Sequence, residues 1–230
     1  MAKILSLDIS STSTGWCVWE TDKAMPTAWG ANRPPQGKRG LARIKWHLKR
    51  LNEIKQQYGP FDLVALEGYP FFLFGANANG APVRTNHGRG PGNAVFGIAE
   101  LTGSMKMLIH YRWATPFANF SPSSIKLYAT GYGRANKEMM MNAVQDEHGI
   151  IVRYDDESDA IYIAQLACDT YQLVEGTLAG NLSPSRDKAI RSILKANNPE
   201  GTFSWLTLTW FDKTFGRKKP RKATRKKGTR

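Results

Sequence analysis

The first 30 residues constrain the fold most strongly, because they favour strands that follow one another with no helix between them. Lys3 to Ile9 has the length and composition of a buried strand, and Trp16 to Trp19 is a second such segment. The polar residues 10–15 separate the two and are typical of a turn. A third short strand fits Ala24 to Gly30. The chain is therefore expected to open with a hairpin, in a sheet that contains antiparallel pairs.

A helix and another strand come next, and this order predicts a crossover. Apolar residues recur every three or four positions from about Arg39 to Tyr58, which indicates an amphipathic helix. Asp62 to Gly68 is a short apolar run of the kind found in buried parallel strands. Further on, we expect helices at Ala94 to Tyr111, Asn136 to His148, Asp156 to Val174 and Arg186 to Ala196, and a strand at Trp113 to Phe120. The pattern predicts an α/β fold with a mixed sheet flanked by helices.

Positive charge is concentrated at the carboxyl end. The net charge is +13, but residues 217–230 hold nine Lys and Arg and no acid, which leaves residues 1–216 with a net charge of only +4. Such a run cannot bury apolar surface, so we expect a disordered arm that seeks phosphates, with a tail that only aids solubility as the alternative. The expected organisation is a main domain over residues 1–175, a C-terminal extension over 176–216 and a basic tail over 217–230.

Composition argues against several classes of protein. Cys17 and Cys168 are isolated in apolar segments, which favours core packing over a disulfide or a thiolate metal site. The four histidines are scattered, so a zinc enzyme is not expected. No apolar run reaches the roughly 18 residues that a membrane-spanning helix needs. We expect no membrane partner and a cytoplasmic protein.

Two candidate site residues stand at the ends of predicted strands. Asp8 ends the first strand, where an isolated aspartate equally fits a turn held by its own side chain. Glu67 ends an apolar run, beside an interior in which a lone charge is costly. A solvated glutamate at the end of a strand is the alternative for Glu67.

Two more acids stand at the amino end of a predicted helix. Asp156 and Asp159 are three residues apart, so they share one face of that helix. An acid at the cap followed by a second acid three residues later also stabilises a helix through capping and the helix dipole. By itself, this pair indicates a cap more often than a metal site.

Taken together, the acids come from three distant elements that a central sheet could bring to one place. Clustered carboxylates repel one another unless a cation lies between them. Hard oxygen ligands without His or Cys favour Mg²⁺ or Mn²⁺, and such ions activate water and stabilise the leaving oxygen in phosphodiester hydrolysis. The residues alone therefore indicate a metal-dependent phosphotransfer enzyme.

Four segments carry a family resemblance over roughly residues 1–171. They are Ile4 to Gly15, Leu63 to Glu67, Ser124 to Lys137, and Asp156 to Ala160 with Ile163 and Ala164. In this order they resemble the RuvC-type Holliday junction resolvases, and the third segment is similar to that family's lysine, Gly-x-Gly and Ala-x-Lys stretch. The ordered set is much more specific than any one segment.

The resemblance implies an RNase H-like fold and a crossover junction endodeoxyribonuclease that resolves Holliday junctions and other branched DNA. It assigns catalysis and the binding of Mg²⁺, or Mn²⁺, to Asp8, Glu67, Asp156 and Asp159. Lys126 and Lys137 would contact DNA phosphates near the cut, with exposed surface charges as the alternative. Symmetric cutting of a four-way junction needs two active sites, so a homodimer is implied as well.

Residues after Glu67 are further candidates for DNA contact. Stacking on bases at the junction centre would suit the aromatic residues Tyr69, Phe71 and Phe72, with a buried aromatic cluster as the alternative. The polar segment from Phe74 to Gly92 is expected to form a surface loop whose bases, Arg84, His87 and Arg89, are placed to meet a phosphate backbone. This loop and everything beyond Glu175 depart from the compact bacterial pattern and resemble phage-encoded members, which act in the cytoplasm of a bacterial host.

Two other functions remain open at this point. An ATP-dependent phosphotransferase of the actin and sugar-kinase fold would also carry an Asp followed by small and hydroxyl residues, as in Asp8 to Gly15. Against it, 230 residues are few for two such lobes, and no second phosphate loop or adenosine-binding glycine motif occurs. The other is a non-catalytic DNA-binding protein, in which the acids form caps and turns and the basic tail supplies the affinity.

Overall fold

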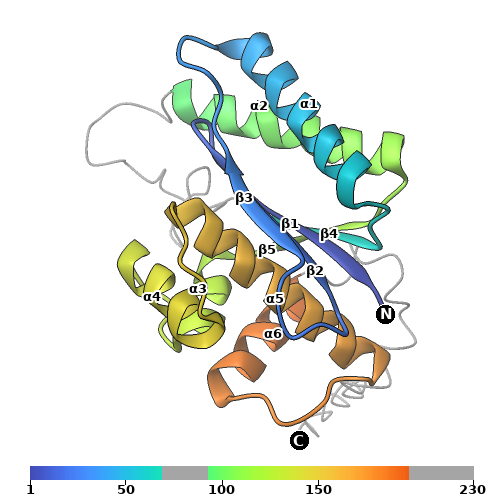
Figure 1. Ribbon diagram of the computed structural model, residues 1–230, viewed down its shortest axis with the longest axis vertical. Helices are drawn as coiled ribbons and strands as arrows, with labels where there is room; N and C mark the ends of the chain where they lie inside the picture. Colours follow the sequence, from blue (N-terminus) through green and yellow to red (C-terminus); the bar gives the residue numbers. More distant parts are fainter. Residues whose placement is uncertain (69–92, 197–230) are drawn as a thin grey trace, which may run out of the picture.

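The fold is known from a computed structural model, which describes residues 1–68 and 93–196. These residues form a five-stranded sheet in the order β3-β2-β1-β4-β5 (Figure 1). The strands are β1 (Lys3–Ile9), β2 (Thr14–Glu20), β3 (Ala28–Asn32), β4 (Leu63–Glu67) and β5 (Phe117–Phe120). The β1–β2 and β2–β3 pairs are antiparallel, whereas the β1–β4 and β4–β5 pairs are parallel. The predicted mixed sheet is confirmed.

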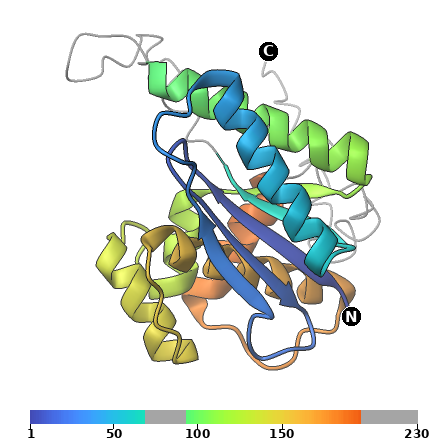
Figure 2. The same ribbon diagram turned by 45° about the horizontal axis from the view of Figure 1, so that its top comes forward.

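Helices cover both faces of this sheet, as Figures 1 and 2 show. One face is covered by α1 (Gly40–Tyr58) and α2 (Asn93–Met107), which continues as the π-helical turn η2 (Leu108–Arg112). The other face is covered by α3 (Pro122–Thr130), α4 (Lys137–His148), α5 (Asp155–Glu175) and α6 (Pro184–Ala196). The helix between β3 and β4 is the predicted crossover.

Alternation along β1 divides the core in two. Leu5 and Leu7 belong to the apolar cluster under α1 and α2, while Ile4 belongs to the cluster under α5. Ser6 shares the α5 face, where its hydroxyl donates a 2.6 Å hydrogen bond to the backbone carbonyl of Ala160. Because side chains alternate with period two, Asp8 also points to the α5 face.

The structure differs from the sequence expectations at three elements. Helix α3 was not predicted, although Ser121 caps it by accepting a hydrogen bond from the backbone N–H of Ser124 and Pro122 is its first residue. Strand β3 begins four residues later than expected, since its register is set by pairing with β2. Strand β5 begins at Phe117, because the preceding helix continues as the π-helical turn.

Other expectations from composition have different outcomes. Cys17 and Cys168 are buried and unbridged, as predicted. Within residues 1–68 and 93–196, no helix is both long and apolar enough to cross a membrane. The loop at 74–92 and the tail at 217–230 lie outside the described residues.

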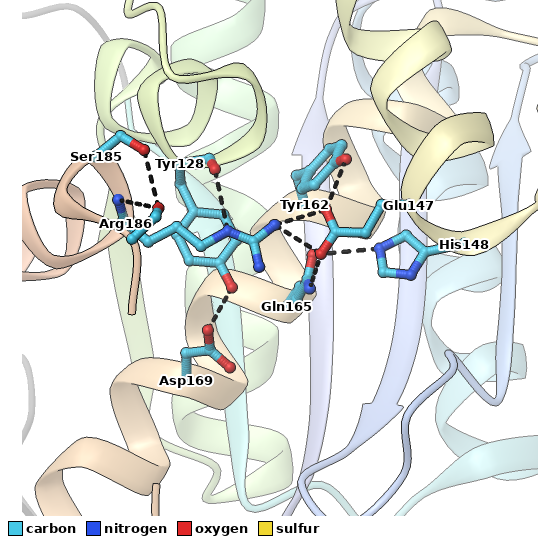
Figure 3. A network of polar contacts seen from close by, with 9 residues as sticks. Tyr128, Glu147, His148, Tyr162, Gln165, Asp169, Ser185 and Arg186 are labelled. Carbon is cyan, nitrogen blue, oxygen red and sulfur yellow. Dashed lines mark hydrogen bonds and ion pairs between the residues drawn. The ribbon is translucent and has the colours of Figure 1, made fainter. Parts of the chain in front are cut away.

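Helix α6 is joined to the body by a polar network (Figure 3). The Arg186 guanidinium donates to both carboxylate oxygens of Glu147 on α4, at 2.5 and 2.6 Å, and its Cζ lies 4.5 Å from the centre of the Tyr128 ring on α3. Glu147 also accepts hydrogen bonds from Tyr162 and Gln165 on α5. Together with Ile190 and Ile193 in the core, these contacts make the first helix after residue 175 part of the same packed body.

We expect Arg186→Ala to lower the free energy of unfolding by about 1–3 kcal/mol, because Glu147 loses a bidentate partner while it stays half-buried. Arg191→Ala on the same helix is the matched control. Its 2.7 Å pair with Asp187 is exposed, so its loss should cost about 0.5 kcal/mol or less. Urea unfolding of both variants measures the difference, and equal losses would contradict a specific role for the Arg186 network.

Candidate active site

Asp8 and Glu67 converge because their strands are parallel neighbours. Leu7 of β1 pairs with Leu66 of β4, and the two acids are the next residues along each strand. Parallel strands end at the same edge of a sheet, and alternation turns both side chains toward α5. Asp8 is only 7% exposed and shares a side-chain hydrogen bond with Glu67. The two carboxyl groups are therefore close neighbours at this edge.

Asp156 and Asp159 reach the same edge from the first two turns of α5. This helix is capped by Glu157, whose carboxylate accepts hydrogen bonds from the backbone N–H groups of Arg153, at 2.7 Å, and Tyr154, at 3.2 Å. These capping bonds are thus made by another acid, whereas Asp156 lies in the first turn, where it complements the helix dipole. Asp156 and Asp159 face the sheet edge.

Gly15 allows α5 to begin this close to the sheet. It lies opposite Asp8 in the β1–β2 register, and a Cβ placed on it would lie 1.9 Å from the carbonyl oxygen of Asp156. Any larger residue would push the first turn of α5 away from β2. Gly15 thus sets the distance between the strand acids and the helix acids.

The charges of the four carboxylates act on one another. Burial raises the pKa of Asp8 well above its usual value, and the charge and hydrogen bond of Glu67 raise it further, followed by smaller effects of Asp159 and Asp156. Burial, followed by the charge of Glu67, raises the pKa of Asp159 to about 7, although Lys126 opposes this shift. The cluster carries more negative charge than the surrounding residues neutralise.

This cluster fits a divalent cation by its donor chemistry. Oδ1 of Asp159 is buried and has no hydrogen-bond partner among the described residues. The donors are hard carboxylate oxygens, the type that Mg²⁺ and Mn²⁺ prefer. In residues 1–68 and 93–196, no three acid, histidine or cysteine side chains already lie in position around one ion. Asp156 instead pairs with Arg33, whose Nη2 lies 3.7 Å from its Oδ2, so the side chains must rearrange to bind a metal.

Both lysines singled out in the sequence lie beside the acids. Lys126 on α3 lowers the pKa of Asp159 by its charge. Lys137, the first residue of α4, forms an ion pair with Asp155 and is 78% exposed. The other candidates for DNA contact, Tyr69, Phe71, Phe72, Arg84, His87 and Arg89, lie outside the described residues.

Two residues beside the cluster, Asp155 and Arg33, were not expected from the sequence. Asp155 stands next to Asp156 and could have been found as a third acid in the same motif. Arg33 carries no sequence signal, because only the pairing of β3 with β2 brings it next to α5.

The raised pKa of Asp159 predicts how the metal-free protein responds to pH. Between its usual value of 3.8 and about 7, the folded state binds a proton that the unfolded chain releases, so this group lowers stability as pH rises through that window. Asp159→Asn should therefore gain stability over the unaltered protein as pH rises from about 4 to about 7, with no further gain above. Thermal unfolding of both proteins in a chelator measures this gain, and a gain independent of pH would contradict the assignment.

Gly15→Ala should lower the free energy of unfolding by about 1–3 kcal/mol, because its Cβ would overlap the backbone of Asp156. Gly103→Ala in α2 is the control, since a Cβ there meets no atom within 4 Å. That variant should be stabilised by about 0.5–1 kcal/mol through the better helix propensity of alanine. Chemical denaturation of both variants would reveal the opposite signs.

Comparison with known proteins gives sequence matches over part of the chain. A crossover junction endodeoxyribonuclease RuvC from Gloeobacter violaceus is 31% identical over 125 residues, which span 54% of this chain and 61% of that protein. A protein of the same name from Endomicrobium trichonymphae is 28% identical over 166 residues, 70% of this chain and 77% of that protein. The chain thus matches less than two thirds of the length of the first relative. No family model matches.

Solved structures match over more of the chain. T. thermophilus RuvC in complex with a Holliday junction substrate aligns with 77% of this chain and 98% of that one, with a TM-score of 0.57 at 18% identity. Another T. thermophilus RuvC structure gives a TM-score of 0.55 at the same identity and covers 76% of this chain and 97% of that one. The chain shares the fold of these RuvC structures, so the expected RNase H-like fold is confirmed.

Proposed function

We propose that this chain is a metal-dependent endonuclease that hydrolyses phosphodiester bonds in branched DNA, foremost in four-way junctions. The observation that carries the proposal is the pair of buried Asp8 and partly exposed Glu67, at the sheet edge where α5 brings Asp156 and Asp159. Further support comes from the two relatives named crossover junction endodeoxyribonuclease and from the similar fold of a RuvC solved with a Holliday junction substrate.

The four carboxylates would hold the cation, Mg²⁺ or Mn²⁺. When bound, such an ion supplies activated water and stabilises the leaving oxygen. Asp8 and Glu67 would supply ligands from the strands, and the buried Oδ1 of Asp159 would gain a partner. Asp156 would ligate the metal in place of its contact with Arg33. A bound cation would offset the repulsion among the acids, which adds to burial in raising the pKa values of Asp8 and Asp159.

Several basic and aromatic residues would bind the DNA. Lys126 and Lys137 contact phosphates near the cut, since both lie beside the acidic cluster. Further DNA contacts come from residues outside the described part of the chain. The aromatic residues Tyr69, Phe71 and Phe72 stack on bases, and Arg84 and Arg89 contact the DNA backbone. The basic tail captures DNA without reading its sequence. Two copies of the chain, acting in the cytoplasm, make the paired cuts in a four-way junction.

The competing functions have less support. An ATP-dependent phosphotransferase of the actin type needs two lobes, whereas the described residues form one five-stranded sheet. A non-catalytic DNA-binding protein would use the acids for caps and turns. That role does not explain Asp159, because Glu157 already caps α5.

Incubation of the purified protein with labelled four-way junction, fork and linear duplex, with and without Mg²⁺, tests the proposal. We expect Mg²⁺-dependent cuts in branched DNA only. Asp8→Asn should slow cutting at least roughly 100-fold, because a metal ligand supports several kcal/mol of transition-state stabilisation. Binding to the junction should persist, since phosphate contacts remain.

Glu53→Gln is the control for this experiment, because Glu53 is an acid on α1 that pairs with Arg50 instead of with the cluster. It should cut at the normal rate. Near-normal cutting by Asp8→Asn would refute the assignment of the site. Binding of junctions without any cutting by the unaltered protein would favour the non-catalytic alternative, and ATP-dependent phosphorylation would favour the kinase.

A further inference from the structure

Arg33 is the one basic residue that pairs with an acid of the four-carboxylate cluster among the described residues. It follows the last residue of β3, which runs parallel to β1, so it emerges at the edge where the acids gather. Its Cζ lies 3.7 Å from the centre of the Tyr154 ring, just before α5. The Tyr154 ring packs against one face of the Arg33 guanidinium and so keeps it beside Asp156.

The contact with Asp156 leaves most of the guanidinium available. The 3.7 Å between Nη2 and Oδ2 is too long for a hydrogen bond, and the Arg33 side chain is 49% exposed. Arg153 lies near the same ring, with its Cζ 5.2 Å from the centre. Both guanidinium groups thus lie close to the Tyr154 ring. The N–H donors of a planar guanidinium have the geometry that suits a phosphate group.

We infer that Arg33, together with Arg153 on Tyr154, forms a binding site for a DNA phosphate next to the reacting bond, and that Arg33 pairs with Asp156 only until a metal ion takes that carboxylate. The inference rests on the proposed function, because it needs both a metal and DNA. A divalent ion and a guanidinium compete for the same oxygen and repel each other. The metal therefore frees Arg33, and the arriving phosphate replaces the lost negative charge.

This exchange makes two predictions of opposite sign for Arg33→Gln. The free protein should bind Mn²⁺ about two- to fivefold more tightly, because a competitor of the strength of a half-exposed ion pair is gone. The junction should bind about tenfold more weakly in Mn²⁺, with the salt dependence of log K lower by about one phosphate contact. In a chelator the loss of junction affinity should be smaller, since Arg33 is then held by Asp156. A purely structural role for Arg33 would not strengthen metal binding.

Calorimetric Mn²⁺ titrations of the full chain, without DNA, measure the first effect. Junction binding is measured in Mn²⁺ and in chelator with proteins that also carry Glu67→Gln, so that the junction stays intact, at Mn²⁺ concentrations that calorimetry shows to saturate this background. Arg50→Gln is the matched control. Arg50 also contacts a carboxylate, Glu53 at 2.5 Å, and an aromatic ring, Trp46 at 5.5 Å, and its side chain is 46% exposed. It should leave Mn²⁺ affinity unchanged and affect junction binding equally in Mn²⁺ and in chelator.

Unchanged or weaker Mn²⁺ binding by Arg33→Gln would overturn the exchange, and so would equal losses of junction affinity in Mn²⁺ and in chelator. A different result would refute the proposed function, namely that the unaltered protein does not cut DNA in the presence of a metal ion. The Mn²⁺ titrations need no cutting, so they decide the exchange with Asp156 in either case.

Discussion

The fit of α5 against β1 and β2 is the constraint on which the rest of the structure depends. Gly15 admits the first turn of the helix, and Ser6 holds it through the carbonyl of Ala160. Ala160 and Ala164 are fully buried and keep the helix close to the sheet. Because two of the four acids are on this helix and two are on the strands, the same contacts that close the core also fix the acidic cluster.

The pKa values of two sets of buried or half-buried carboxylates shift in opposite directions. Burial tends to raise the pKa of Glu147, but hydrogen bonds from Arg186 and Gln165 outweigh it and the pKa is lowered. At the sheet edge, burial and neighbouring acids together raise the pKa values of Asp8 and Asp159. Among the described residues, the acids at the sheet edge raise one another's pKa values, and a bound cation would relieve this repulsion, as expected of a functional site that costs stability.

Basic residues surround the acids without neutralising them fully. Arg33 reaches Asp156, Lys137 reaches Asp155 and Lys126 acts on Asp159. Arg33 and Lys137 have well-exposed side chains, so solvent screening keeps these pairs weak. Weak pairs can exchange partners, which is what the proposed binding of both cations and phosphates would require.

The sequence by itself determined the elements whose information is local. Period-two and period-3.6 patterns gave β1, β4, α1 and α5, and therefore the class of the fold and the four acids at element ends. Helix α3 was missed although Ser121 and Pro122 mark its start, because a nine-residue helix has too few turns for a clear periodic signal. Tertiary structure alone decided which acid caps α5, where β3 begins, and that Arg33 lies over Tyr154. Each of these depends on contacts between residues distant in the chain, and the side-chain pattern of a single segment does not encode its partner.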